Sequence, residues 1–280
     1  MLVFAYDGSL NGDWVAHYAA RFAANTRERT LRLVHVQEAS PPSPSSQMQD
    51  RIARIAAECR LLGVVLETEL HARGHADVAE RLLELVPAGA MVVAGTRARP
   101  RKRALLANTV SARLIAAGRF SVVAIRVLHP GVLGQPGRVL LPLTEQSRGA
   151  EPALPLLRLI GLDLVKLHVL FVRELSRLCL RLSGHEKVER LVESGQAFVA
   201  RVEEELRAGL APHRFELDSS VLVSDDAPRE MIVQAGKLRS RLICLGVPER
   251  TRRGLLVHGS TIERVLRDAP ADVAVYRSVE

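Results

Sequence analysis

The sequence predicts an α/β protein made of two tandem, doubly wound, parallel five-stranded sheets. Short apolar runs alternate with helical stretches of about 10–20 residues, which is the pattern of βαβ units. Several of these runs are apolar throughout, as strands are when both faces of a parallel sheet are covered. The series of elements occurs twice within 280 residues, of which 48% are hydrophobic and 25% charged. This length and composition suit two globular domains of ordinary size.

Both halves present their elements in the same order. The first half has strand-like segments at 2–6, 31–36, 65–71, 90–94 and 121–127, with helical segments near 45–62, 76–86 and 109–118. The second half has strand-like segments at 139–143, 164–170, 215–223, 241–245 and 272–277, with helical segments near 186–210, 227–237 and 260–268. In both halves the first strand is followed by a polar turn and a further helical stretch. The pairs His35-Val36 and His168-Val169 are interpreted as equivalent positions of this repeat.

The segment HPGVLGQPG at 129–137 has the composition of a linker. We therefore expect one domain at 1–128 and a second at 138–280. The second half carries extra residues at about 172–186, which form either a longer helical connection or a flap.

A strand followed by a loop and a helix closes each half. Gly95 and Gly246 end apolar strands, where glycine lets the backbone turn sharply and approach a ligand. The helix that follows begins with unpaired N–H groups, and its dipole favours negative charge. Ser260 and Thr261 place hydroxyls where they can cap these amides or bind a phosphate oxygen.

The spacing of this unit resembles the G-x2-G-x9-G-[ST] signature of universal stress proteins. The matching positions are Gly246, Glu249, Gly259, Ser260 and Thr261 in the second half, and Gly95, Ala98, Asn108 and Thr109 in the first. Asp7-Gly8-Ser9 resembles the family's opening motif, and the tail IERVLRDAPADVAVYR resembles its last helix and strand. The resemblance covers essentially the whole chain, because each half resembles one domain of the family.

A tandem universal stress protein has a Rossmann-like fold of the adenine nucleotide α-hydrolase type. The resemblance implies an adenine nucleotide ligand, ATP, ADP or AMP, with or without Mg²⁺. Asp7 then lies on the adenosine side of a crevice, and the backbone at Val36 and Val169 contacts adenine. The family's strand order sets Asp7 beside Gly95 in one crevice and Thr144 beside Gly246 in the other.

The family's members pair through their last strands. Here, strands 121–127 and 272–277 would form that pair within one chain, antiparallel, as an internal pseudo-dimer. The whole chain either stays a monomer with this internal pair or also forms a homodimer, and the sequence leaves both alternatives.

Each half departs from the family pattern. In the first, Ala98 and Asn108 replace glycines, although asparagine tolerates unusual backbone angles and caps helices. In the second, Thr144 replaces the aspartate and Glu249 the middle glycine, and a carboxylate there repels phosphate unless it turns outward or holds a metal ion. We expect at most one strong nucleotide site, with the stronger phosphate cradle in the second half.

Two further features stay open. The basic segment 97–103 holds five positive charges, and it serves a bound nucleotide, a nucleic acid or acidic protein, or no partner at all. Nucleic acid is the less favoured partner, since no aromatic residues interleave with the charges. His258 precedes Gly259 and is either a phosphate ligand or a surface residue. His35 and His168 lie within apolar strands, where a structural role is expected.

The leading hypothesis is an ATP-binding stress-response regulator or sensor. The sequence lacks a GxSxG elbow, an HExxH motif and a P-loop, so we expect no catalytic residues and slow ATP hydrolysis at most. The alternative is a nucleotide-free interaction module that recruits a partner through the basic segment 97–103 or the 172–186 insertion.

The composition also bounds the location. No apolar run is long enough to span a membrane, and the N-terminus lacks the features of a signal peptide. The three cysteines show no metal-ligand spacing. We therefore expect a cytoplasmic protein with no membrane partner and no protein-bound metal.

Overall fold

The computed structural model describes residues 1–37, 45–96, 109–130, 135–182, 184–247 and 261–279. Its centre is one ten-stranded sheet with the order β3-β2-β1-β4-β5-β10-β9-β6-β7-β8. Strands β1 to β5 and strands β6 to β10 repeat one order, and every neighbouring pair is parallel except β5 with β10. The predicted fold class, with two doubly wound parallel sheets joined as an internal pseudo-dimer, is confirmed.

The elements of the first half follow the predicted order. They are β1 (Leu2–Ala5), α1 (Leu10–Ala24), β2 (Thr30–Gln37), α2 (Ser46–Leu61), β3 (Val65–Ala72), α3 (Val78–Leu85), β4 (Met91–Gly95), α4 (Val110–Ala117) and β5 (Ser121–Arg126). Side-chain caps start the helices: Ser9 accepts from the Gly12 amide at α1, and Asp77 with Glu80 forms a capping box at α3.

The second half repeats the strands but changes the helices. Its elements are β6 (Arg138–Thr144), η2 (Glu151–Ala153), α5 (Leu154–Ile160), η3 (Gly161–Asp163), β7 (Lys166–Glu174), α6 (Arg177–Leu182), α7 (His185–Leu210), β8 (Glu216–Ser224), α8 (Ala227–Lys237), β9 (Leu242–Gly246), α9 (Thr261–Asp268) and β10 (Asp272–Arg277). The 172–186 insertion becomes the end of β7, the short helix α6 and the start of α7. It is therefore part of a helical connection.

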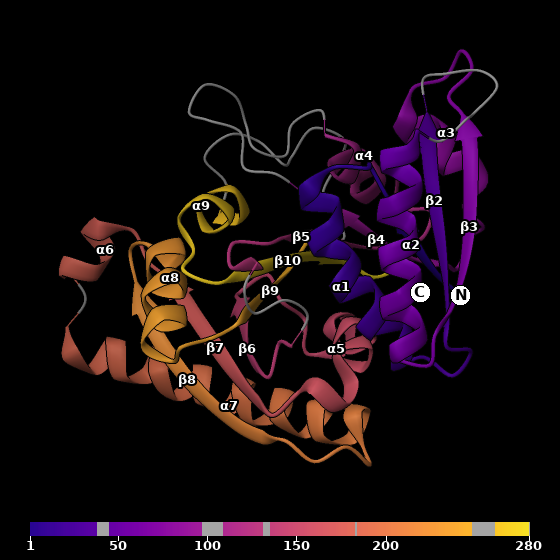
Figure 1. The fold of residues 1–280 in the computed structure, drawn as a ribbon. Coiled ribbons are helices and arrows are strands. Elements are labelled where there is room, and N and C mark those ends of the chain that lie inside the picture. The colour runs from indigo at the N-terminus through magenta and orange to yellow at the C-terminus, as the bar shows by residue number, and fades with distance from the viewer. Residues whose placement is uncertain (38–44, 97–108, 131–134, 183, 248–260, 280) are drawn as a thin grey trace.

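Each face of the sheet carries one apolar core that runs through both halves. On one face, Val15 of α1, Ile55 of α2, Leu156 of α5 and Val199 of α7 are buried in a common cluster. On the other, helices α3, α4, α8 and α9 are buried through side chains such as Leu82 and Val265. Figure 1 shows the helices arranged about the long sheet in this way.

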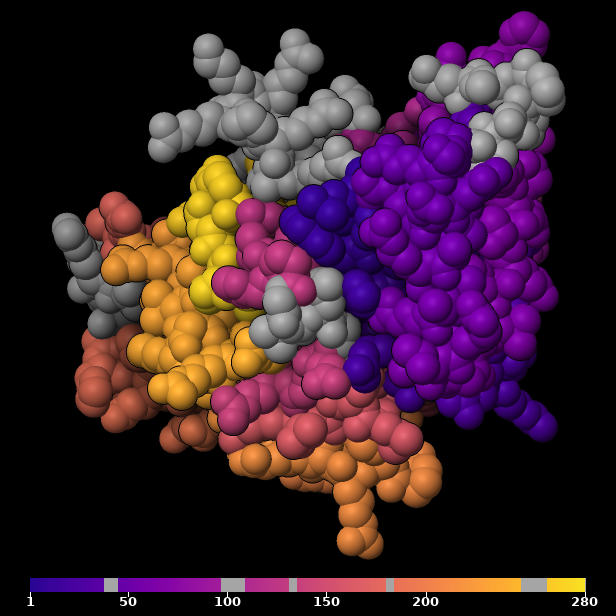
Figure 2. Space-filling model, in the orientation of Figure 1, coloured from indigo at the N-terminus to yellow at the C-terminus, as the bar shows by residue number. Residues whose placement is uncertain are grey.

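The two halves meet along the antiparallel pair β5 and β10, where Ile125 lies opposite Ala274. This confirms the predicted pairing of these two strands. Helix α1 also packs against α5, and the Asn25 side chain donates to the Leu159 and Ile160 carbonyls at 3.0 and 2.8 Å. Figure 2 shows the indigo-to-purple first half pressed against the second half along a broad boundary. The pairing covers two strands that would otherwise be exposed edges.

Candidate functional site

The order of the sheet reverses twice, once between β1 and β4 and once between β6 and β9. In open α/β sheets, ligands bind beyond the carboxyl ends of the strands at such a reversal. In the first half, Ala5 at the end of β1 lies opposite Ala94, so Asp7, just beyond β1, and Gly95, the last residue of β4, lie at adjacent strand ends. In the second half, Thr144 ends β6 and Gly246 ends β9. Each predicted pair thus lies at a reversal.

The loop after β1 is tightly ordered around Asp7. The Asp7 carboxylate accepts from the Ser9 amide at 3.0 Å and from the Ser9 hydroxyl at 2.6 Å. Gly8 has a φ of +70°, a left-handed conformation that favours glycine. A Cβ added at Gly12 would lie 2.5 Å from the Asp7 carboxylate. The first turn of α1 therefore closes directly onto Asp7.

Tyr6 and Met48, which the sequence did not single out, border this loop together with His35. A His35 ring nitrogen, Nδ1, lies 2.7 Å from the Tyr6 carbonyl and donates to it. The Met48 methyl group packs on Gly8, because a Cβ added there would lie 2.4 Å from it. Burial and a 2.5 Å hydrogen bond to Asp13 raise the pKa of Tyr6. The adenine end predicted next to Asp7 is thus bordered by Tyr6, His35 and Met48.

The phosphate end of the first half is described in part. Thr109 caps α4, since its hydroxyl accepts from the Ala112 amide at 3.1 Å. Thr96 follows Gly95 and is 3% exposed, and its hydroxyl has no hydrogen-bond partner among the described residues. Ala98, Asn108 and the basic segment 97–103 lie outside the described residues. The predicted helix terminus is therefore present, and the loop that leads to it stays a prediction.

The second reversal has a different local structure. The ladder between β6 and β9 joins only Val139 with Leu242 and Leu140 with Ile243. The Arg138 carbonyl accepts from the Arg241 amide, so the alternate residues Leu140 and Pro142 also turn toward β9. Proline has no N–H to donate, which ends the ladder at this point. A proline is unusual in a central strand, so Pro142 was a signal in the sequence that the prediction of this strand did not use.

Beyond Pro142, β6 ends in a tight turn. The Thr144 amide donates to the Ser147 hydroxyl at 3.1 Å, and the Ser147 amide donates to the Thr144 carbonyl at 2.9 Å. Thr261 begins α9, whereas Glu249, His258, Gly259 and Ser260 lie outside the described residues. The stronger phosphate cradle assigned to the second half is accordingly still a prediction.

The equivalence of His35-Val36 with His168-Val169 is wrong. In the first half, Leu2 of β1 lies opposite Met91 of β4 and Leu31 of β2. In the second half, Val139 of β6 occupies the same place, because it lies opposite Leu242 of β9 and Leu167 of β7. Leu31 therefore corresponds to Leu167, which makes Val172 the counterpart of Val36. Val169 lies three residues earlier, in the buried middle of β7.

A shift of three residues also reverses the face of a strand. His168 corresponds to Arg32, and both reach the neighbouring edge strand. The Arg32 guanidinium holds the pKa of Glu69 at about 2, and a ring nitrogen of His168, Nε2, lies 2.9 Å from the Ser220 hydroxyl. Burial lowers the pKa of His168, which favours the neutral form of its ring.

An ion pair beside each crevice is repeated and was missed in the sequence. Asp77, the N-cap of α3, pairs with Arg113 of α4, and Asp226, the N-cap of α8, pairs with Arg264 of α9 at 2.8 Å. Each arginine is the fourth residue of its helix. The paired guanidinium lowers the pKa of both carboxyls. These pairs fix the last helix of each half against the helix before it.

The described residues contain no group of three or more His, Cys, Asp or Glu side chains placed to hold a metal ion. Within the same residues, no helix is both long and apolar enough to cross a membrane.

Comparison with known proteins gives one match by sequence. The model of the universal stress protein family matches residues 1–126. Among curated protein sequences, none matches the chain.

Solved structures resemble the chain over its whole length. A universal stress protein from Archaeoglobus fulgidus is 18% identical with a TM-score of 0.63, and the match covers 98% of this chain and 97% of that one. A protein of unknown function from Pseudomonas aeruginosa is 17% identical with a TM-score of 0.59, covering 98% and 91%. The cytoplasmic domain of a prokaryotic cation chloride cotransporter is 11% identical with a TM-score of 0.56, covering 99% and 95%.

At these identities the structures show a shared fold, and proteins of different function share it. Residues 1–126 therefore carry the sequence match to the universal stress protein family, and residues 138–280 share the fold.

Proposed function

We propose that the chain is a tandem universal stress protein that binds an adenine nucleotide and acts as a regulator or sensor rather than as a catalyst. Its domains are residues 1–128 and 138–280, joined by the linker 129–137. The observation that carries the proposal is the repeated reversal of strand order, with Asp7 and Gly95 at one reversal and Thr144 and Gly246 at the other. The family match of residues 1–126 supports it.

The chemistry of these strand ends favours a phosphate-bearing ligand. Thr109 and Thr261 mark the starts of α4 and α9, where free helix N–H groups attract anions. The proposed binding residues are those predicted from the sequence in the first half and in the second half. The proposed nucleotide is ATP, ADP or AMP, with or without Mg²⁺.

The cytoplasm is the proposed location. Cys59, Cys179 and Cys244 form no disulfide, which suits a reducing compartment.

The direct test is to purify the protein without added nucleotide, denature it, and identify any nucleotide that is released. Titration calorimetry then gives the affinity for ATP and AMP. Gly259→Asp places a carboxylate in the second loop, with Asn108→Asp as the matched change in the first. We expect Gly259→Asp to weaken ATP binding by at least about tenfold and Asn108→Asp to change it little. A protein that releases no nucleotide and binds none below millimolar concentrations would refute the proposal.

A nucleotide-free interaction module is the second candidate, favoured by the packing of Met48 on Gly8. A side chain of the protein itself then occupies part of the first crevice. Met48→Ala separates the two candidates. If the crevice is a working site, this change alters nucleotide affinity, and if the crevice is vestigial, neither protein binds nucleotide.

A further inference from the structure

The ten-stranded sheet ends in two edge strands, β3 in the first half and β8 in the second. Within the described residues, β3 pairs only with β2 and β8 only with β7. An edge strand offers a row of free N–H and C=O groups to another strand, and soluble proteins usually protect it. The two edges differ in this protection.

Strand β3 is protected by its glutamates. The Val65 amide donates to the carbonyl of Arg29, just before β2, so the alternate residues Leu66, Thr68 and Leu70 turn their backbone groups outward. Antiparallel pairing of β3 with its own copy must set these outward residues opposite one another. Every central register then places Glu67 or Glu69 opposite a glutamate of the copy, and like charges directly opposite destabilise a sheet. Arg32 pairs with Glu69 and reduces this repulsion, whereas the register proposed below for β8 sets no acid opposite another acid.

Strand β8 has nine residues, ELDSSVLVS, without proline, glycine or lysine. The Glu216 amide donates to the Val165 carbonyl of the neighbouring chain segment, so Leu217, Ser219, Val221 and Val223 turn their backbone groups outward. Its two carboxylates share one cation, because the Lys166 ammonium lies 2.5 Å from both Glu216 and Asp218, and this leaves a single net negative charge. The rest of the strand is uncharged.

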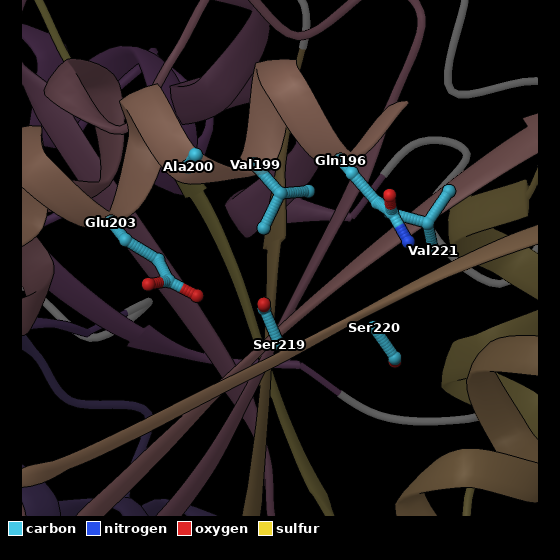
Figure 3. A pocket seen from close by; sticks show the side chains of 7 residues that line it. All are labelled: Gln196, Val199, Ala200, Glu203, Ser219, Ser220 and Val221. Atoms are coloured by element: carbon cyan, nitrogen blue, oxygen red, sulfur yellow. The ribbon is translucent and has the colours of Figure 1, made fainter. Parts of the chain in front are cut away.

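Helix α7 leaves this edge open. Between α7 and β8 lies a hollow of about 200 Å³, lined by Gln196, Val199, Ala200, Glu203, Ser219, Ser220 and Val221. Figure 3 shows Ser219 pointing up toward the helix and Ser220 pointing the other way. Ser219 is exposed, so α7 does not cover the strand at this point.

We propose that β8 is the interface for a second copy of this chain, paired antiparallel about Ser220. In this register, Ser219 lies opposite Val221 of the copy and Leu217 opposite Val223, which are all outward-facing residues that exchange hydrogen bonds. Asp218 then lies opposite Leu222 and Glu216 opposite Ser224, so no two acids meet. The two sheets join into one continuous sheet.

The oligomeric state of the full chain tests this interface. Analytical ultracentrifugation of the wild-type protein should give a molecular mass twice the 30.7 kDa of one chain. Ser219→Pro removes one outward N–H from an exposed position and should raise the dimer dissociation constant at least about tenfold. Thr68→Pro makes the matched change on β3, at another exposed outward residue, and should leave the dimer intact.

Two further variants cover the case in which a proline disturbs folding. Ser219→Lys adds an edge charge without changing the backbone and should also weaken the dimer. Ser220→Cys in a Cys179→Ser background should form an intermolecular disulfide on mild oxidation, because residue 220 faces its own copy. A monomeric wild-type protein, or a dimer unchanged in both Ser219 variants, overturns the proposal. Weakening by Thr68→Pro to the same extent would also overturn it.

Discussion

The two halves of the molecule share a strand order but differ where the order reverses. In the first half, β1 pairs with β4 along its full length and leads through Asp7 into the 15-residue helix α1. In the second half, Pro142 ends the ladder early, and Thr144 leads into a turn followed by short helices. Buried strands determine the sheet, whereas the site depends on the loops that follow them. The sheet can therefore be repeated in a chain without repetition of the site.

A second comparison lies at the junction of the halves, where the contacts are related by an approximate twofold axis. The Leu128 amide, two residues beyond β5, donates to Asp272 at the start of β10 at 2.7 Å. The Val279 amide, two residues beyond β10, donates to the Ser121 hydroxyl at the start of β5 at 3.0 Å. Asp272 is 4% exposed and also accepts from the Tyr18 hydroxyl at 2.6 Å. The same backbone contact is thus buried on one side and exposed on the other.

The largest expected effect comes from breaking the buried side of this junction. Asp272→Ala leaves the Tyr18 hydroxyl and two backbone amides, those of Leu128 and His129, without their acceptor. We expect a loss of about 3 kcal/mol in the free energy of unfolding, measured by urea denaturation. Ser121→Ala, the matched change, should cost less than about 1 kcal/mol because its partner amide can reach water. Equal losses for the two variants would show that burial does not distinguish them.

A smaller effect is expected at the ends of the two central strands. Arg277 of β10 donates to the Ile115 carbonyl at 2.8 Å, at the carboxyl end of α4, where a cation is favourable. Its counterpart Arg126 is half-buried, and one of its terminal nitrogens has no hydrogen-bond partner among the described residues. Burial accordingly lowers the pKa of Arg126.

Arg277→Met should therefore lower stability by about 1–2 kcal/mol, whereas Arg126→Met should leave it unchanged or raise it. Urea denaturation of both variants measures the difference, with Arg277→Lys as the control that keeps the charge. A greater loss for Arg126→Met than for Arg277→Met would contradict the comparison.

The order of elements could be predicted from the sequence because apolar runs and helical periodicity are local signals. The equivalence of His35 with His168 failed because a matching dipeptide carries no information on register. Their hydrogen bonds, to the Tyr6 carbonyl and to Ser220, lie on opposite faces of the sheet. Only the ladders with neighbouring strands reveal the three-residue displacement.

The candidate site could be predicted less completely. Asp7 and Gly95 follow from the motif and lie at the expected strand ends. Met48 comes from a helix that begins about 40 residues beyond Asp7, and no local pattern indicates that its side chain packs on Gly8. The pairs Asp77–Arg113 and Asp226–Arg264 join helices that are distant in sequence. In both halves the aspartate is a helix N-cap and the arginine is the fourth residue of the following helix, which was a usable signal.

The smallest effect is expected at those two ion pairs, and it sharpens the comparison of the halves through pH. Asp77→Asn and Asp226→Asn keep a helix-capping side chain but remove the charge. The arginine lowers the pKa of each carboxyl, so each pair stabilises the fold above the unfolded value of about 3.9, and this contribution is lost as pH falls through the folded pKa. Each variant should thus be less stable than the wild type at pH 7, by less than about 1 kcal/mol, and the difference should shrink below about pH 4.

Asp226→Asn should cost more than Asp77→Asn, because the Asp226 side chain is 23% exposed and that of Asp77 is 47% exposed. Salt near 0.5 M should therefore reduce the Asp77 effect more than the Asp226 effect, since exposed charges are screened more strongly. Urea denaturation of the wild type and both variants, at pH 7 and pH 3 and with and without salt, measures these differences in the free energy of unfolding. A difference from the wild type that grows on acidification would mean that these carboxylates do not stabilise the fold through their arginines.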